Sequence, residues 1–514
     1  MESSQLLQAQ QIVQRRTEPS SQDLLVPLVR QLVQAGEKVL IFRNNRGSAQ
    51  GCAKYLADEL CLPPAEDVID ALPELDQSNR SRQLRECLAG GTAFHTSDLK
   101  VEERIAIETS FRGADGPVRV LVATSTVAAG VNTPASTVII VETKFRDDEG
   151  ERPYTVAQYK NMAGRAGRLG FREQGRSVLI AETSGEQARL FANYVKQNPE
   201  PIKSSFQNRS PDTWLIRLLA QGPRVTKQQA VDLLANTYGG YLASRADPGW
   251  RAHITPQIQA LVTRMLANGL LEEDPDGTIH LTILGNACGQ SPFELESALR
   301  LVEMLRRLSF GVTARDVMAL VQATPEMDGD YTPLSRARVG EPSRPFEVAH
   351  RFGSQISSLL QTRAREQGVY HRRCKRALVL ADWIDGLPLD EIERRYSPNA
   401  FSVLAAGDIT GYADTARFYL QSAFKIASVI SSQGLTEEDV VNLTRQLELG
   451  IPAAALRLLE MPLTLVRGEY LALHNAGIND FSALRAMNQG KLISLFGKRR
   501  AQELMLVLAT VSSN

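Results

Sequence analysis

Cysteine is scarce in this chain of 514 residues, and its few cysteines are scattered: Cys52, Cys61, Cys87, Cys288 and Cys374. No two of them form a CxxC pair, the spacing on which zinc and redox motifs are usually built. This scatter argues against a zinc site and against a disulfide framework, and it favours a reducing compartment. We therefore expect no metal held by cysteine.

Long apolar runs and an excess of one charge are missing as well. No apolar stretch reaches the roughly 20 residues of a membrane-spanning helix, and the polar, glutamine-rich residues 1–16 lack the pattern of a signal peptide. The 58 Lys and Arg residues equal the 58 Asp and Glu residues, so affinity for a polyanion must come from local patches. We expect a cytoplasmic protein with no membrane partner, and the length predicts roughly three to four domains.

Two patterns of a complete nucleotide site are also absent. The phosphate-binding pattern GxxxxGK[ST] does not occur, because Lys491 and Lys498 follow a glycine but precede leucine and arginine. No DExH sequence stands at the end of an apolar strand, and Asp148-Glu149 lies in a charged segment. The lysine that cradles phosphates and the acid that holds magnesium are thus missing from these 514 residues. A complete ATPase site of this type is therefore not found in the sequence.

Short apolar runs alternate with helical patterns over residues 22–200. The runs are Lys38–Phe42, Thr92–His95, Val118–Ala123, Val138–Glu142 and Ser177–Ala181. Runs of this length, bounded by polar residues, are typical of buried parallel strands, and their alternation with helices predicts an open parallel sheet in an α/β domain. Functional residues of such sheets gather beyond the carboxyl ends of the strands, where Asn44–Ser48 and Thr124–Thr126 are placed.

The remaining sequence divides into a short arm and three further parts. Residues 1–21 are a polar arm, and Asn198-Pro199-Glu200-Pro201 marks a sharp boundary. Over residues 201–291, three short helices and a hairpin with an Asp276-Gly277 turn predict a winged helix. Amphipathic patterns then predict a helical bundle over 292–432 and a small helical domain over 433–514.

Two arginines in the stretch Gln158–Arg168, QYKNMAGRAGR, are the strongest candidates for chemistry. Arg165 and Arg168 are three residues apart, so on a helix both guanidinium groups share one face. Gly164 and Gly167 remove side-chain bulk beside them. Repeated planar cations suit a polyphosphate, although a lone pair of this kind is more often a solvated basic face.

Upstream of these arginines, Val118–Ala135 reads VRVLVATSTVAAGVNTPA. Together with MAGRAGR it resembles motifs V and VI of superfamily 2 nucleic-acid helicases of the superkiller type, which include archaeal repair helicases and the helicase part of DNA polymerase theta. The resemblance covers nearly all of the chain from residue 22 onward, but only the family's back half. It implies a second RecA-like motor domain over 22–200, a winged helix, a ratchet bundle and a helix–hairpin–helix-like domain.

The resemblance also implies roles in nucleotide contact. Arg165 and Arg168 would reach the γ-phosphate of an ATP bound mainly by a first motor domain, while Gly130 and Asn132 would face the nucleotide. Asn161 stands where the family usually has glutamine, and this shorter amide puts one nucleotide contact in doubt. For Arg168, a surface ion pair is the plainer alternative.

Four further residues are expected at the nucleic-acid backbone. Thr124 and Thr126 offer hydroxyl groups, and the resemblance places Arg46 and Ser48 in a loop that contacts phosphodiesters. Such contacts hold the strand without reading its sequence. The plainer alternatives are a simple chain turn at VNTPA and a solvated loop arginine at position 46.

Arg376 and Trp383, in CKRALVLADWIDGL, resemble the family's strand-gripping ratchet helix. They are seven residues apart and so share one helix face. An exposed tryptophan can stack on bases, which contributes roughly 1–3 kcal/mol per base. An ordinary core tryptophan is the alternative that an isolated Trp would favour.

These features support three hypotheses. In the first, the chain is the C-terminal motor and strand-gripping half of an ATP-dependent 3′–5′ helicase, inactive alone and completed by another chain with the first RecA-like domain. That domain would hold the Mg²⁺ of ATP, and the substrate would be single-stranded nucleic acid, with DNA favoured over RNA. The second is a non-catalytic single-strand-binding module, and the third is a protein-binding scaffold. A split gene, a fragment and a motorless relative all fit the sequence.

Overall fold

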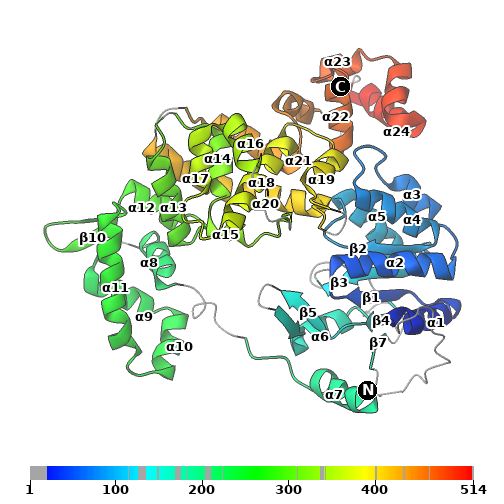
Figure 1. The fold of residues 1–514 in the computed structure, drawn as a ribbon, viewed down its shortest axis with the longest axis horizontal. Coiled ribbons are helices and arrows are strands. Elements are labelled where there is room, and N and C mark those ends of the chain that lie inside the picture. The colour runs from blue at the N-terminus through cyan, green and yellow to red at the C-terminus, as the bar shows by residue number, and fades with distance from the viewer. Residues whose placement is uncertain are drawn as a thin grey trace. The chain divides into compact units, whose positions relative to one another are not determined.

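The computed structural model describes residues 20–511 except for 114, 126–134, 148–149, 168–174, 182, 203–209, 223, 310, 336–340, 342, 400–401, 432–433 and 462–463. The chain forms two compact units, Met1–Ile202 with Ala405–Gly407 and Lys203–Leu404 with Asp408–Asn514. They are described separately below (Figure 1). None of the described helices combines the length and the apolar character needed to cross a membrane.

The first unit is built on a five-stranded parallel sheet in the order β2-β3-β1-β4-β7. Its strands are β1 (Val39–Arg43), β2 (Thr92–His95), β3 (Val120–Thr124), β4 (Thr137–Ile140) and β7 (Arg176–Leu179). The central strand β1 pairs through Val39 with Val120 on one side and Thr137 on the other. Every residue of β2, β3 and β4 is buried, which explains their continuous apolar sequences. The five expected strands and the α/β class are therefore confirmed.

Helices cover the sheet of the first unit. They are α1 (Ser21–Gln34), α2 (Arg46–Leu60), α3 (Glu66–Ala71), α4 (Asn79–Ala89), α5 (Val101–Arg112), α6 (Val156–Ala163), α7 (Ser184–Leu190) and a π-helical turn, Phe191–Val195. Helix α1 begins at Ser21 because the Ser20 hydroxyl caps it, accepting a hydrogen bond from the Gln22 amide. Helix α2 packs across β1, β2 and β3, where Ala49, Ala53 and Leu56 are fully buried.

A hairpin between β4 and α6 was not anticipated from the sequence. Strands β5 (Lys144–Asp147) and β6 (Gly150–Pro153) pair antiparallel, and Phe145 stacks on Tyr154 with ring centroids 5.3 Å apart. After the hairpin, α6 begins with its first amides bound by the Glu200 carboxylate, at 2.7 Å from the Val156 nitrogen. This contact fixes the start of the helix that leads to Arg165.

Lys38 stands immediately before β1 in a setting that disfavours its charge. Its ammonium donates to the carbonyl oxygens of Phe111, at 2.8 Å, and of Gly113. Burial, together with the nearby Arg119 charge, lowers the pKa of Lys38 from 10.5 to about 8. The folded state therefore releases this proton at a lower pH than the unfolded chain does.

This lowered pKa predicts a pH-dependent stability. Between about pH 8 and about pH 10 the unfolded chain keeps the Lys38 proton that the folded chain has lost, so stability rises with pH. We expect the difference in unfolding free energy between wild type and Lys38→Met to shift in favour of wild type by up to about 2 kcal/mol over this window. Chemical denaturation of both proteins across the window measures the shift. A difference that stays constant with pH would contradict the assignment, because the other titrating groups are common to both proteins.

The second unit opens with helices and a small sheet. They are α8 (Pro211–Leu219), β8 (Val225–Thr226), α9 (Lys227–Ala235), α10 (Tyr238–Ala246), α11 (Trp250–Ala267), β9 (Leu271–Glu273) and β10 (Thr278–Leu281). The sheet has the order β8-β10-β9 with antiparallel pairs. The hairpin expected at Asp276-Gly277 is confirmed, and Gly277 supplies the positive φ of 79° that its turn requires.

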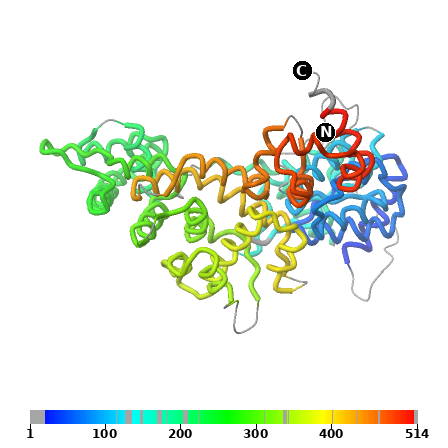
Figure 2. The backbone as a smooth tube through the Cα atoms, turned by 90° about the horizontal axis from the view of Figure 1, so that it is seen from above, coloured from blue at the N-terminus to red at the C-terminus, as the bar shows by residue number. Residues whose placement is uncertain are grey.

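A helical bundle follows. Its helices are α12 (Ile283–Gly289), α13 (Leu295–Arg306), α14 (Ala314–Val321), α15 (Pro325–Asp328), α16 (Ser343–Phe352), α17 (Ser354–Leu360), α18 (Gln367–Ile384), α19 (Leu389–Tyr396) and α20 (Ala406–Ile430). The 25-residue helix α20 can be followed as a long tube in Figure 2. Helix α18 is the centre of the bundle, because it packs against α14 to α17 and α19 and is buried almost continuously from Tyr370 to Ile384.

The last helices are α21 (Glu437–Leu449), a 3₁₀ segment (Ala453–Glu460), α22 (Arg467–Asn475), α23 (Phe481–Arg485) and α24 (Gln489–Val511), which is interrupted at Gly497. Helix α21 packs against α18 and α14. A helix of the expected last domain thus packs on the bundle. The expected domain limits remain predictions.

Candidate functional site

The carboxyl ends of three neighbouring strands bring polar side chains together. Thr124 ends β3, Arg43 ends β1, and Glu142 follows β4. The Glu142 carboxylate accepts from Arg43 Nε at 2.8 Å and from the Asn44 backbone nitrogen at 3.1 Å. The ion pair thus closes the loop after β1, and Thr124, which is 6% exposed, lies on the strand beside it.

Arg46 and Ser48 lie in the first turn of α2, directly beyond β1. The Asn45 side chain caps this helix by accepting from the Ser48 nitrogen at 2.8 Å. Arg46 pairs with Asp98, a buried carboxylate that Gln50 also contacts at 2.8 Å. The ion pair with Asp98 therefore orients the Arg46 side chain, of which 34% stays exposed. Contact of Arg46 and Ser48 with a phosphodiester remains a prediction.

Arg165 lies in the turn that ends α6, held by backbone bonds. The Ala135 nitrogen donates to the Arg165 carbonyl oxygen at 3.1 Å, and the Gly167 nitrogen donates to the Ala135 carbonyl oxygen at 3.0 Å. Gly167 has a positive φ of 67°, a conformation that favours glycine. These bonds attach the arginine turn to the residue that precedes β4, and the Arg165 side chain is half-buried there.

The expected site residues therefore lie at two edges of the sheet. Arg46, Ser48 and Thr124 are at the carboxyl edge, whereas Arg165 is attached beside the amino end of β4. Asn161 is exposed on α6, one turn before Arg165. The remaining expected residues, Thr126, Gly130, Asn132 and Arg168, lie outside the described residues. This arrangement suits two separate contacts better than one shared pocket.

Arg376 is buried, contrary to its expected role at the surface. Its guanidinium donates to the Gln322 carbonyl oxygen at 3.0 Å and to the Thr332 hydroxyl at 3.2 Å, and it pairs with Asp328 at 3.4 Å. Burial lowers the pKa of Arg376. The side chain has no exposed surface. It ties α18 to the segment around α15.

Trp383 is also a core residue, with 3% of its surface exposed. Its indole nitrogen donates to the Leu447 carbonyl oxygen at 2.8 Å, and the Arg467 guanidinium lies 4.1 Å from the ring centroid. A Cβ on Gly450 would approach the ring to 2.3 Å, so the chain passes directly over it. The expected exposed pair is therefore wrong: the two residues do share a face, but other helices cover it.

The basic run near Arg376 is largely internal as well. Arg373 pairs with Asp328 at 2.7 Å, and Lys375 pairs with Glu341 at 2.8 Å. Both basic side chains are buried. Their acidic partners stand more than thirty residues upstream, and only a scan for compensating acids across the bundle could have found them. A dense basic run in the sequence is thus no measure of exposed positive charge.

Comparison with known proteins identifies two domains. Residues 22–170 match the helicase conserved C-terminal domain, and residues 316–450 match domain 4 of archaeal helicases. The chain therefore contains two domains of helicase type. The resemblance to superfamily 2 helicases stated from the sequence is confirmed, and so is the RecA-like fold of the first unit.

Several relatives of this chain are archaeal. The ATP-dependent DNA helicase Hel308 of Pyrococcus abyssi is 26% identical over 476 residues, which cover 91% of this chain and 63% of that relative. Hel308 of Pyrococcus horikoshii is 25% identical, with the same two coverages. Hel308 of Pyrobaculum calidifontis is 28% identical and covers 80% of this chain and 55% of its own length. The chain thus spans less than two thirds of the relatives it matches.

Neither a metal site nor a phosphate-binding loop is found in what is described of this chain. Among the described residues, no group of His, Cys, Asp or Glu side chains is arranged to hold a metal ion. The phosphate-binding lysine pattern is absent from the whole sequence. The described His, Cys, Asp and Glu side chains are not arranged to bind a magnesium ion, so we name no ligand for that ion among them. Of the residues expected to contact the nucleotide, Arg165 and Asn161 are described, and the Arg165 guanidinium is the one whose charge suits a phosphate.

Proposed function

We propose that this chain supplies the second motor domain and the strand-binding part of an ATP-dependent 3′–5′ DNA helicase. A first motor domain, with the phosphate-binding lysine and the acid that holds Mg²⁺, would come from outside these 514 residues, on a separate chain. The five-part division expected from the sequence belongs to the same proposal. Its main support is the turn of Arg165, which is fixed to the sheet although the chain has no phosphate-binding loop of its own.

The anchoring of Arg165 carries the nucleotide part of the proposal. An arginine that stabilises a phosphoryl group in the transition state must hold its position, because a misplaced charge stabilises little. The paired backbone bonds to Ala135 and the cap of Glu200 fix both ends of this short helical segment. In our proposal Arg165 and Arg168 meet the γ-phosphate of an ATP that the first motor domain presents, with Gly130, Asn132 and Asn161 beside it.

The carboxyl edge of the sheet carries the strand part of the proposal. The Arg46 side chain is 34% exposed and forms an ion pair with Asp98. Thr124 ends β3, the strand that pairs with β1. A guanidinium and hydroxyl groups can hold phosphodiester oxygens without reading the base sequence. We propose that Arg46, Ser48, Thr124 and Thr126 contact single-stranded DNA. Because Thr124 and Ala135 belong to one continuous stretch of sequence, Val118–Ala135, strand and nucleotide contacts would be joined by a short piece of chain.

Reconstitution tests the proposal. The full chain is mixed with a polypeptide that carries a first motor domain and with single-stranded DNA, and ATP hydrolysis is measured. We expect turnover above the sum of the separate parts, dependent on DNA. No added turnover, combined with salt-dependent binding of DNA that ignores ATP, would instead identify the chain as a non-catalytic strand-binding module.

A further inference from the structure

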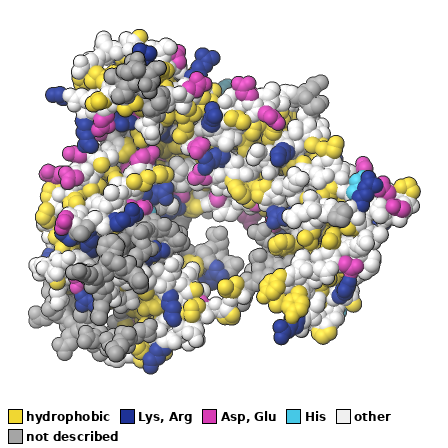
Figure 3. Space-filling view, turned by 180° about the vertical axis from the view of Figure 1, so that it is seen from behind, with side chains coloured by type: hydrophobic (Ala, Val, Ile, Leu, Met, Phe, Trp, Pro, Cys, Tyr) yellow, Lys and Arg dark blue, Asp and Glu magenta, His cyan; other side chains and the backbone are white. Residues whose placement is uncertain are grey.

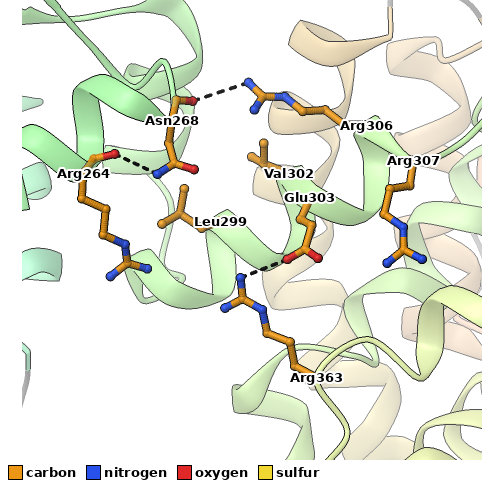
Figure 4. Close-up of a pocket in the computed structure, with 8 residues that line it drawn as sticks. All are labelled: Arg264, Asn268, Leu299, Val302, Glu303, Arg306, Arg307 and Arg363. Carbon is orange, nitrogen blue, oxygen red and sulfur yellow. Dashed lines mark hydrogen bonds and ion pairs between the residues drawn. The ribbon is translucent and has the colours of Figure 1, made fainter.

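A pocket of about 520 Å³ opens in the second unit between α11 and α13. Figure 4 shows side chains from both helices and from the loop before α18 converging on it. The residues that line it are Arg264, Asn268, Leu299, Val302, Glu303, Arg306, Arg307 and Arg363. We call it the arginine pocket. None of the sequence patterns discussed above pointed to it.

The arginine pocket carries an excess of positive charge. Four arginines line it, and the carboxylates that contact them are Glu303, 3.0 Å from Arg363, and Glu296, which pairs with Arg363 and Arg264. Counting these two acids, two positive charges stay uncompensated. For Arg307 the described part of the chain shows no ion pair. On the face shown in Figure 3, by contrast, basic side chains are scattered among acidic and polar ones.

The lining of the arginine pocket favours the binding of an anion. Its floor is apolar, since Leu299 and Val302 are 6% and 2% exposed. An apolar floor lowers the local dielectric constant, which strengthens attraction between the guanidinium groups and an anion. Arg363 has a positive φ of 54°, an unfavourable conformation for a residue with a side chain. Such a conformation is typical of functional sites, and here its side chain points into the pocket (Figure 4).

We propose that the arginine pocket binds the phosphate oxygens of a nucleic-acid backbone. This inference rests on the proposed strand-binding function and adds a contact between α11 and the bundle. Guanidinium groups offer paired N–H donors that match phosphate oxygens, and several around one hollow can hold two neighbouring phosphates. Arg306 and Arg307 are exposed and face the entering strand, while Glu303 competes with it for Arg363.

Paired variants of the full chain test the pocket. Arg306→Gln with Arg307→Gln removes two exposed pocket charges, and Arg245→Gln with Arg394→Gln removes two exposed charges elsewhere in the same unit. Affinity for a labelled single-stranded oligonucleotide is measured over a series of salt concentrations. We expect the pocket variant to lower affinity and to reduce the slope of log K against log salt by about 1.4, which corresponds to two phosphate contacts. The matched variant should leave the slope nearly unchanged.

Glu303→Gln should change the affinity for the oligonucleotide in the opposite direction. Removing this carboxylate takes away one of the two acids that pair with Arg363 and leaves only Glu296, so affinity for the oligonucleotide should rise several-fold even if the protein becomes slightly less stable. An ion-pair cluster with only a structural role would lose stability and gain no affinity. A pocket variant that matches the control, together with an unchanged Glu303→Gln variant, would overturn nucleic-acid binding at this site.

Inorganic pyrophosphate separates the possible sources of the phosphate. If pyrophosphate raises the thermal midpoint of wild type but not of the Arg306→Gln/Arg307→Gln variant, while oligonucleotide affinity is unchanged, the pocket takes a free polyphosphate. If neither ligand responds to the pocket variants, the anion site itself is refuted. Wild type that binds no oligonucleotide at all would refute the proposed function, and the pyrophosphate comparison would still test the pocket.

Discussion

Arg165→Ala is expected to lower ATP hydrolysis by the completed motor about 10³-fold, the lower end of the effect of removing an arginine that meets a transferring phosphoryl group. The side chain leaves while the backbone bonds between Ala135 and the arginine turn remain, so the fold should persist. Steady-state hydrolysis is measured with the first motor domain and saturating single-stranded DNA. Thermal unfolding of the variant shows whether the first unit is intact.

Two companion variants make this result specific. Arg189→Ala removes an arginine whose side chain is 66% exposed on α7, and it should leave hydrolysis unchanged. Arg165→Lys keeps the charge but loses the planar fork, so it should recover only a small part of the rate. Strand affinity without nucleotide should be equal in all of them. If Arg165→Ala hydrolyses ATP as fast as Arg189→Ala does, Arg165 is a structural residue and the motor proposal fails.

The sheet could be predicted from the sequence because four of its five strands, β1 to β4, are buried almost throughout and read as short, mainly apolar runs. A short apolar run such as Val120–Thr124 is typical of a buried strand. The polar residues on either side of the run indicate, to within a few positions, where the strand begins and ends. The hairpin of β5 and β6 could not be found in the same way. Its strands read KFRD and GERP, with neither a continuous apolar run nor strict alternation, and Glu151 to Pro153 are exposed.

The sequence predicted single residues of the candidate site but not how these residues lie relative to one another. The spacing predicted that Arg165 and Arg168 share one face of a helix, but Arg165 lies in the turn after α6. The direction of that helix decides which edge of the sheet the turn reaches. Glu200 and Ala135, which anchor the two ends of the segment, are distant from it in the sequence, and no pattern in the sequence shows that they contact it. The arginine pocket shows the same limit, since Arg264, Arg306 and Arg363 come from three separate segments.

The error at Arg376 and Trp383 has a physical cause. A spacing of seven places two residues on one helix face, but it does not say whether water or protein meets that face. On α18 both faces are covered, and the partners of Arg376 include Asp328, 48 residues earlier. The carbonyl that receives the Trp383 indole belongs to Leu447, 64 residues later. Exposure is set by these distant segments, so local spacing could not supply it.

Trp383→Ala is expected to destabilise the second unit by about 3–5 kcal/mol, because it empties a large buried volume. It also leaves the Leu447 carbonyl without its donor and removes the ring beneath the Arg467 guanidinium. Unfolding of the unit that contains α18 is measured by chemical denaturation. Trp383→Phe should cost less, since a ring remains while the indole hydrogen bond is lost.

The matched control for Trp383→Ala is Phe418→Ala on α20, an aromatic side chain that is 63% exposed. Its removal should change the unfolding free energy by no more than about 0.5 kcal/mol. A core role and a base-stacking role for Trp383 predict opposite results. If Trp383 stacked on a strand, its loss would weaken strand affinity by roughly 1–3 kcal/mol and spare stability. The buried indole predicts a large loss of stability, with the strand affinity of the folded variant unchanged.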